Sequence, residues 1–398
     1  MKHRSPLHLA LGVLITLAAF FALFIACDGG SSSSSTSSTS STSTSSSSSG
    51  STACGTTKLR SIPVDTSVRG PWPVGSRTVT ISGLKTEVWY PAVPGSEAGK
   101  SKDWIDTRQY MPDSNPDPNN PIFQINSYKG LPLDTAYGPY PVIVYVHGTG
   151  SFRTASHGLF THWASRGFVV LCADNPGINM GDIMSGGCGA LMSADQKGDT
   201  QKILTAVRAQ SGDLSFLSGR LATDRIGLGG HSAGGAAIGS LGGERGVQVI
   251  IPMASGGVQS GTYVKSALVM GGLKDNTATP AIVRSGYNST PTSLKKRLVM
   301  IPNSGHMAFT SVCPIVLYTD EDLGALSTVA NDGCGSQYMD PAQSTQIVNF
   351  ASTAVYEETL TCSSTAASQI STISSKFSGV EYQYNPGSSS SSSSGGCN

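Results

Sequence analysis

The sequence predicts an α/β protein with a mostly parallel, doubly wound central sheet and helices on both faces. Short apolar runs, such as residues 141–146, 168–172 and 247–253, alternate along the chain with helical patterns. This is the order expected when crossover helices connect parallel strands. The runs are apolar at nearly every position, as in strands that are buried on both faces.

The first 57 residues have the pattern of an export and anchoring segment. Lys2 and Arg4 precede a long apolar run that ends at residue 26, so residues 1–26 are expected to be a signal peptide. Cys27 follows in a context that resembles a bacterial lipid-attachment site, and we expect it to be lipidated. An uncleaved membrane anchor is the alternative, because the run is nearly long enough to span a bilayer. Residues 27–57 then form the anchor cysteine with its Ser/Thr-rich linker.

The folded part is expected over residues 58–386, followed by a Ser-rich tail over 387–398. Ser/Thr tracts cannot bury apolar area, so they act as flexible tethers. The net charge is +1 and the basic residues are scattered, which gives no basis for nucleic-acid binding. We expect a monomer that is exported as a bacterial cell-envelope lipoprotein, or secreted, and that meets a membrane only through its anchor.

The first elements of the folded part are a hairpin and a long insertion. Residues 78–81 and 85–89 are expected to pair as antiparallel strands around a turn at Ser82 and Gly83. Residues 91–141 are rich in Pro, Asn, Asp and Gly, and are too long for a simple connection. They form either a mobile loop or cap over the site, or a surface excursion.

The remaining elements alternate between strand and helix. A strand over 141–146 leads into the loop from His147 to Gly150. We expect His147 to structure this loop rather than take part in chemistry. Residues 175–193 are a second candidate cap. The further predicted elements are helices over 154–166, 195–210 and 343–360, and strands over 168–172, 225–229, 247–253, 267–270 and 298–301.

Function is indicated most strongly by the sequence Gly230-His231-Ser232-Ala233-Gly234. It follows the apolar strand 225–229 and precedes a helical pattern that starts near residue 236. A serine flanked by glycines two residues away on each side, between a strand and a helix, is typical of a nucleophile elbow. The sharp turn exposes the serine hydroxyl above the sheet, and we expect Ser232 to be the nucleophile.

The partners of Ser232 follow from chain order, which in this arrangement is Ser, then Asp or Glu, then His. His306 is the one histidine after Ser232, and Glu244 and Asp275 are the two carboxylates between them. Glu244 comes too soon after the nucleophile helix to follow a later strand. Asp275 and His306 each follow an apolar strand, so both lie where open α/β sheets place their sites. We expect the triad Ser232, Asp275 and His306.

These motifs resemble α/β-hydrolase serine esterases, over about residues 88–360. Two bacterial groups are similar: the platelet-activating-factor-acetylhydrolase-like esterases, often labelled predicted dienelactone hydrolases, and the cutinase-like polyester hydrolases. The matching stretches are residues 88–92, 141–150, 164–170, the elbow, 271–280 and 305–310.

The resemblance implies the rest of the site. The backbone N–H groups of Thr149 and Ala233 would form the oxyanion hole. Neither a metal nor an organic cofactor is required. Further substrate contacts are expected from His231, Gly148, Phe152, Gly256 and Thr277, although for His231 a packing role in the elbow is an equal alternative.

The predicted substrates are short acyl esters or lipids. Residues 88–91 and the long segment that follows favour the acetylhydrolase-like group. A polyester hydrolase or a plant-wall esterase is the alternative, but Thr149 and Gly256 stand where polyester hydrolases carry aromatic residues. A non-catalytic, envelope-anchored binding module is the remote alternative.

The chain has eight cysteines, and export permits disulfides. Cys313 and Cys334 flank a loop after His306 and are expected to pair. Cys172 is a candidate buried thiol. The spacing leaves the pairing of Cys54, Cys188, Cys362 and Cys397 open, and no cysteine or histidine spacing indicates zinc.

Overall fold

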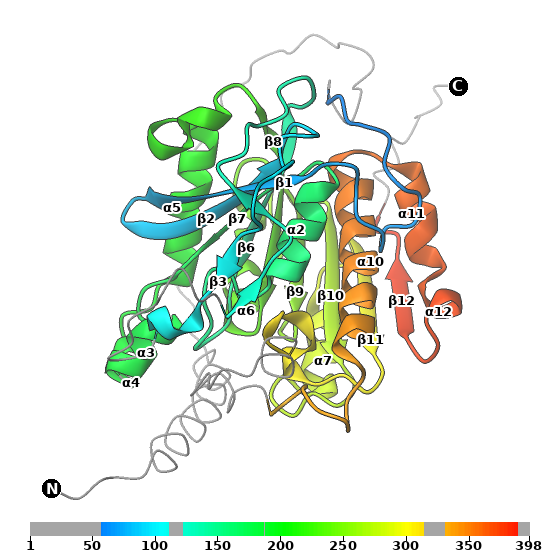
Figure 1. The fold of residues 1–398 in the computed structure, drawn as a ribbon. Helices are drawn as coiled ribbons and strands as arrows, with labels where there is room; N and C mark the ends of the chain where they lie inside the picture. The colour runs from blue at the N-terminus through cyan, green and yellow to red at the C-terminus, as the bar shows by residue number, and fades with distance from the viewer. Residues whose placement is uncertain (1–56, 111–121, 187, 314–330, 389–398) are drawn as a thin grey trace, which may run out of the picture. The chain divides into compact units, whose positions relative to one another are not determined.

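A ten-stranded sheet forms the centre of the domain (Figure 1). The computed structural model describes residues 57–110, 122–186, 188–313 and 331–388. Along the sheet the strand order is β12-β11-β10-β9-β8-β6-β7-β2-β1-β5. Their bounds are β1 (Val74–Ile81), β2 (Leu84–Pro91), β5 (Tyr128–Lys129), β6 (Tyr140–Val146), β7 (Val169–Ala173), β8 (Leu221–His231), β9 (Val247–Met253), β10 (Ser266–Gly272), β11 (Lys295–Ile301) and β12 (Glu381–Asn385).

The six central strands, from β7 to β11 in the sheet order, pair in parallel. Antiparallel pairs occur toward the two edges, where β2 pairs with β1 and β7, and β12 pairs with β11. The predicted hairpin is present, and its turn residues Ser82 and Gly83 both have positive φ. Because the central strands are parallel, their carboxyl ends meet at one edge of the sheet. The prediction of a mostly parallel, doubly wound sheet is confirmed.

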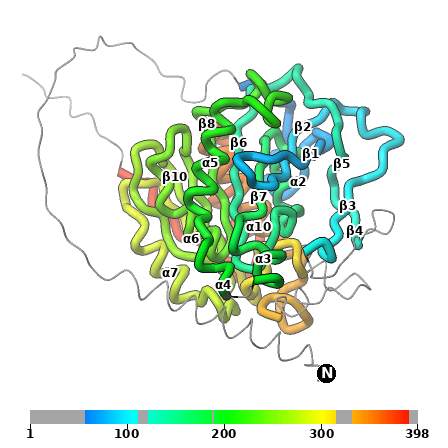
Figure 2. The backbone as a smooth tube through the Cα atoms, turned by 90° about the vertical axis from the view of Figure 1, so that its left-hand side faces the viewer, coloured from blue at the N-terminus to red at the C-terminus, as the bar shows by residue number. Residues whose placement is uncertain are grey.

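Helices cover both faces of the sheet (Figures 1 and 2). In β6, Val142, Val144 and Val146 pack with apolar residues of α5. The intervening Tyr145 points the other way, with its ring centroid 6.1 Å from that of Trp163 in α2. Helices α2 and α10 cover the second face, and α5, α6 and α7 cover the first. The helix bounds are α2 (His157–Ser165), α3 (Met180–Gly186), α4 (Cys188–Leu191), α5 (Gln196–Ala209), α6 (Ala233–Ile238), α7 (Pro280–Ser289), α10 (Pro341–Leu360), α11 (Ser364–Ser371) and α12 (Ile373–Lys376).

The described parts of the 91–141 segment pack against the domain. They contain the short pair β3 (Trp104–Ile105) and β4 (Phe123–Gln124), the turn η1 (Thr107–Tyr110), and the edge strand β5. Ile105, Tyr110 and Ile122 share an apolar cluster with Phe152 and Val312. The segment therefore contacts the loop that follows His306.

The bonding states of the cysteines agree in part with those expected from the sequence. Cys313 and Cys334 form a disulfide, with their Cα atoms 5.2 Å apart, and Cys172 is a buried free thiol. Cys362 also takes part in a disulfide. Cys54 and Cys397 lie outside the described residues.

The predicted signal peptide, Cys27 and the Ser/Thr-rich linker also lie outside the described residues. Within the part of the chain that the structure describes, no helix has both the length and the apolar character needed to cross a bilayer.

Candidate active site

Ser232 lies in the sharp turn between β8 and α6, as the elbow pattern predicts. Its φ is +54° and its ψ is −122°, a backbone conformation that non-glycine residues rarely adopt. A Cβ atom on Gly234 would lie 2.1 Å from the carbonyl oxygen of Val146, and one on Gly230 would lie 2.6 Å from that of Gly234. The two glycines are therefore required because strand and helix backbones pass too closely for side chains.

Asp275 and His306 follow the neighbouring strands β10 and β11, and their side chains meet. His306 Nδ1 lies 3.0 Å from Asp275 Oδ2 and 3.2 Å from Oδ1. The backbone N–H groups of Thr277 and Ala278 donate to Asp275 Oδ1 at 2.8 and 2.7 Å. Asp275 and His306 are both almost fully buried. In the neutral imidazole, the Nδ1–H group of His306 donates to the carboxylate, and Nε2 is the ring nitrogen that can accept.

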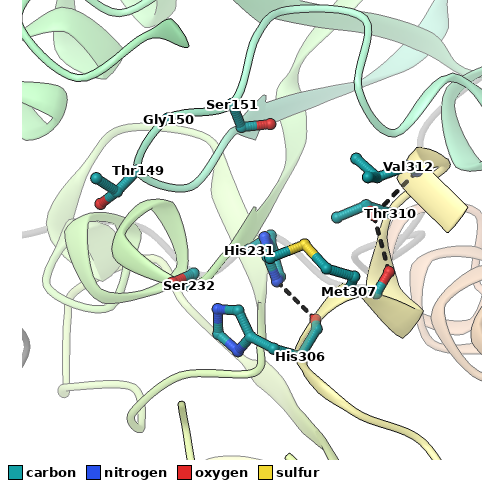
Figure 3. A pocket seen from close by; sticks show the side chains of 9 residues that line it. All are labelled: Thr149, Gly150, Ser151, His231, Ser232, His306, Met307, Thr310 and Val312. Carbon is teal, nitrogen blue, oxygen red and sulfur yellow. Dashed lines mark hydrogen bonds between the residues drawn. The ribbon is translucent and has the colours of Figure 1, made fainter. Parts of the chain in front are cut away.

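Ser232 and His306 line one pocket, and Figure 3 shows the imidazole extending toward the serine. Among the described residues, no hydrogen bond joins the Ser232 hydroxyl to His306. In substrate-free sites this bond is often long and tightens on binding. The other lining residues are Thr149, Gly150, Ser151, His231, Met307, Thr310 and Val312.

The backbone N–H groups of Thr149 and Ala233 are free to bind a ligand. Ala233 is the first residue of α6, where N–H groups have no partner within the helix. Neither N–H donates to an acceptor within the described part of the chain. The helix N-terminus also carries a partial positive charge, so a negatively charged oxygen is favoured near Ala233.

His147 orders the loop that carries Thr149. The backbone N–H of Asn175 donates to His147 Nε2 at 3.1 Å, and the imidazole Nδ1–H donates to the carbonyl of Gly148 at 2.8 Å. Burial lowers the pKa of His147 below its usual value. The ring is therefore neutral and structural, in line with its predicted role in the loop.

His231 lines the pocket and also contacts the backbone of His306. Its Nε2–H donates to the His306 carbonyl at 3.0 Å, and the two ring centroids are 4.7 Å apart. Burial and the neighbouring His306 lower the pKa of His231 well below its usual range. The ring therefore lines the pocket and also packs against His306, an arrangement that is compatible with both roles considered for His231.

Four predicted substrate contacts, Phe152, Thr277, Gly256 and Gly148, do not line the pocket. Phe152 is fully buried and stacks on Tyr110, with ring centroids 5.0 Å apart. Thr277 holds Asp275 through its backbone, and its hydroxyl donates to Asp332 at 2.7 Å. Gly256 is also absent from the lining. The resemblance implies these positions, but it does not fix which residues of a loop face the pocket.

Gly148 lies directly beneath the site. A Cβ at this position would come within 3.0 Å of Ser232 Cβ and 3.1 Å of His231 Nδ1. Gly148 therefore allows the loop of Thr149 to approach the elbow.

The sequence prediction missed the residues that close the pocket after His306. Met307, Thr310 and Val312 line it, and Asp332 contacts the backbone of His306. The stretch 305–310 was already a matching motif, so Met307 and Thr310 could have been found there. Nothing in the sequence placed Asp332 near the site, because it lies 26 residues beyond the histidine.

Glu244, the carboxylate set aside in the sequence, lies elsewhere. It accepts from Arg208 at 3.0 Å and from Gln201 at 2.8 Å, both in α5. In the described residues, no group of three or more His, Cys, Asp or Glu side chains could hold a metal ion.

Comparisons with known proteins agree with this geometry. Residues 122–175, which contain β6, the loop of Thr149, α2 and β7, match a family model described as platelet-activating factor acetylhydrolase, isoform II. No curated protein matches the chain. A solved ferulic acid esterase from Streptomyces cinnamoneus is 18% identical, with a TM-score of 0.56, and the match covers 74% of this chain and 92% of that one.

The structural likeness confirms the α/β-hydrolase fold. Together with the family match, it supports an ester-hydrolysing enzyme that is similar to the platelet-activating-factor-acetylhydrolase-like serine esterases.

Proposed function

We propose that this ester-hydrolysing enzyme is a serine carboxylic-ester hydrolase that acts through an acyl-enzyme. One observation carries the proposal: a buried Asp275–His306 hydrogen bond of 3.0 Å adjoins a serine held in an elbow at φ +54°. In this mechanism His306 Nε2 removes the Ser232 proton, and the serine oxygen attacks the ester carbonyl. Asp275 keeps the imidazole in the required tautomer and stabilises its charged form.

The free N–H groups of Thr149 and Ala233 hold the oxyanion of the tetrahedral intermediate. Loss of one such donor typically costs about 2.7–4 kcal/mol of transition-state stabilisation. His306 then returns its proton to the leaving alkoxide, and the alcohol departs. Water, activated by the same imidazole, hydrolyses the acyl-enzyme and restores Ser232.

Small acyl groups suit the pocket best. Its cavity volume is about 30 Å³, and one water molecule needs roughly 10–15 Å³ of such space. Met307, Thr310 and Val312 close one side. These features support short acyl esters, including acetylated lipids, over long acyl chains.

A substrate panel tests this choice. Hydrolysis of p-nitrophenyl esters of increasing acyl length, of a feruloyl ester and of a polyester film should show the highest kcat/KM for the shortest acyl groups. The feruloyl ester tests the activity for which the similar solved structure, a ferulic acid esterase, is named. A preference for the feruloyl ester or the film would replace the short-acyl proposal without affecting the triad.

The nucleophile is tested by Ser232→Ala. We expect this variant to lose ester hydrolysis while it unfolds at nearly the same temperature as the parent chain. A fluorophosphonate probe should label Ser232 alone in the parent chain. Hydrolysis or labelling that persists in the variant would show that another residue is the nucleophile.

We also propose export and lipidation at Cys27, which the N-terminal sequence supports. The Cys313–Cys334 disulfide is compatible with an oxidising compartment. Incorporation of a labelled fatty acid in a bacterial host should depend on Cys27 and should be lost in Cys27→Ala. Equal incorporation in both chains would refute lipidation at this residue.

A further inference from the structure

The alignment of Asp275 with His306 depends on two separate loops. The loop after β10 carries Asp275, and the loop after β11 carries His306. Through the hydrogen bond between the two side chains, Asp275 orients the imidazole of His306. The two loops meet through the backbone N–H of Lys274, which donates to the carbonyl of Ser304 at 2.9 Å, and a side chain that contacts both loops would hold them further in place.

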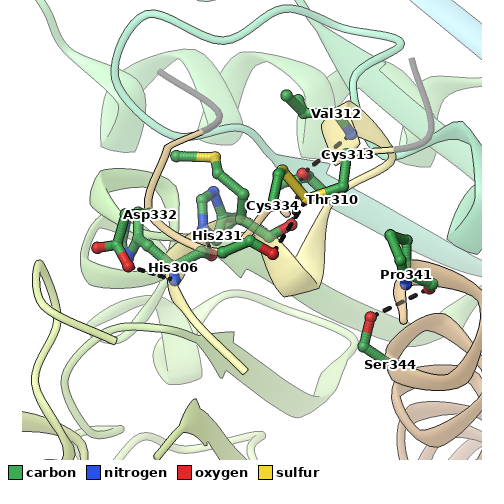
Figure 4. The surroundings of a disulfide bond; sticks show 11 residues. His231, His306, Thr310, Val312, Cys313, Asp332, Cys334, Pro341 and Ser344 are labelled. Carbon is green, nitrogen blue, oxygen red and sulfur yellow. Dashed lines mark hydrogen bonds between the residues drawn. A yellow bond between two sulfur atoms is a disulfide. The ribbon is translucent and has the colours of Figure 1, made fainter. Parts of the chain in front are cut away.

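We propose that Asp332 is the positioning residue that joins these two loops; this inference rests on the proposed function. Its Oδ1 accepts from the backbone N–H of His306 at 3.3 Å (Figure 4). Its Oδ2 accepts from the backbone N–H of Asn276 at 3.2 Å and from the Thr277 hydroxyl at 2.7 Å. Asn276 and Thr277 directly follow Asp275. One carboxylate therefore binds the two residues that follow the acid and the backbone of the base.

The backbone of Asp332 adds a further contact on the histidine side. Its carbonyl accepts from the N–H of Met307 at 2.8 Å. A Cβ on Gly305 would lie only 2.7 Å from Asp332 Oδ1, so glycine at 305 is what allows the carboxylate to come this close. The residues on both sides of His306 are thus fitted to Asp332.

The disulfide fixes Asp332 in turn. Cys334, two residues further along, is bonded to Cys313, and both half-cystines are buried in the apolar cluster that contains Val312 (Figure 4). The chain around Asp332 is therefore anchored covalently to the segment that closes the pocket. This anchoring allows one half-buried carboxylate to hold two loops.

A carboxylate suits this place better than an amide. When it is ionised it offers acceptors only, and all three groups around it, two N–H groups and one hydroxyl, can donate. Asparagine keeps an acceptor for one loop, but its NH₂ group opposes the donors of the other. Asp332 does not touch the reacting atoms, so its effect is on alignment, and small misplacements of catalytic groups cost large factors in rate.

The test compares Asp332→Ala and Asp332→Asn with the parent full-length chain. With p-nitrophenyl acetate, we expect Asp332→Ala to lower kcat by about 10- to 100-fold with little change in KM. Phosphonylation of Ser232 should slow by a similar factor. Asp332→Asn should lie between the parent and the alanine variant, because it preserves the contact to one loop.

The pH profile separates positioning from general loss of structure. When the Asp275–His306 bond is loosened, the carboxylate stabilises the imidazolium less, so the apparent pKa in the kcat/KM profile should shift downward in both variants. Asp213→Ala is the matched control. Asp213 Oδ2 accepts from the backbone N–H of Thr80 at 2.9 Å, away from the pocket, so this variant should change stability without changing kcat or the profile.

Each result is decisive. Parent-like kcat, labelling rate and pH profile in Asp332→Ala would overturn the positioning role, while loss of activity in Ser232→Ala would leave the proposed function intact. If Asp332→Ala does not fold, Asp332→Asn decides, and a parent-like profile there overturns the role. Hydrolysis that survives Ser232→Ala would instead refute the proposed function itself.

Discussion

At the scale of single residues, the hydrogen bonds of Asp275 determine which nitrogen of His306 can act as a base. Two backbone N–H groups, from Thr277 and Ala278, hold the carboxylate in one orientation. The carboxylate then accepts from Nδ1 of the imidazole. In the proposed mechanism Nε2 then accepts the proton of Ser232, so the orientation of the acid selects the nitrogen that acts as the base.

In the proposed mechanism, substitution of Asp275 should lower kcat far more than substitution of Glu244. Asp275→Asn should lower kcat by about 10⁴-fold, because an amide can hold the wrong tautomer of His306. Glu244→Gln removes a charge that pairs with Arg208 on α5, and kcat should be nearly unchanged. Steady-state kinetics of both variants checks the assignment, and the opposite ranking would make Glu244 the acid.

Much of the site at this scale could be predicted from the sequence. Chain order and the position after a strand led to Asp275 and His306, whose side chains lie within hydrogen-bond distance, because these features fix where a loop begins. Phe152 and Thr277 do not line the pocket, because the direction of a loop side chain depends on contacts that sequence spacing does not encode. Asp332 was missed for a related reason, since a disulfide brings it back to His306 across a long stretch of chain.

At the scale of elements, the approach of β6, β8 and α6 sets the position of Ser232, the proposed nucleophile. Gly234 stands where α6 passes the carbonyl oxygen of Val146 at the end of β6. Gly230, the penultimate residue of β8, lies against the first turn of the same helix. The three elements can therefore approach this closely because these two positions carry no side chain.

Gly234→Ala should consequently be severe. A Cβ 2.1 Å from a backbone oxygen forces strand and helix apart, and we expect a loss of about 3 kcal/mol or more in the free energy of unfolding. Gly243→Ala is the control, because a Cβ there meets nothing within 4 Å. Urea denaturation measures both variants. Equal stability of the two would mean that the elbow can relax around a side chain.

The elements were predicted unevenly. The central strands were found because continuous apolar runs require burial on both faces. Strand β12, with the sequence Glu-Tyr-Gln-Tyr-Asn, is largely polar and partly exposed at the sheet edge. It exists because it pairs with β11, and pairing of this kind leaves no hydrophobic pattern in the chain.

At the scale of the whole molecule, buried histidines make the stability of the fold depend on pH. His162 is buried and its Nε2–H donates to the carbonyl of Thr66 at 2.9 Å. Burial lowers its pKa to about 3. Burial also lowers the pKa values of His147 and His231, which order the loop of Thr149 and the loop of His306. In the folded chain the His162 ring therefore remains neutral in mildly acidic solution.

The stability of the domain should therefore fall with acid. Below a pH of about 6.5 the unfolded histidines bind protons that the folded ones exclude. For His162 the loss runs from about pH 6.5 down to its folded pKa of about 3, at up to about 1.4 kcal/mol per pH unit. Urea denaturation at pH 7.5, 6 and 5 should show this decline, and His162→Gln should make it less steep. A constant free energy of unfolding across this range would contradict the prediction.

The backbone of Ser232 has a consequence for attempts to engineer the protein. A non-glycine residue at φ +54° holds strain that is typically about 1–3 kcal/mol, and glycine adopts this conformation without a Cβ penalty. Ser232→Gly would relieve the strain and remove the nucleophile in one step. A selection for heat resistance alone would thus favour inactive descendants, so any such selection has to score turnover in the same round.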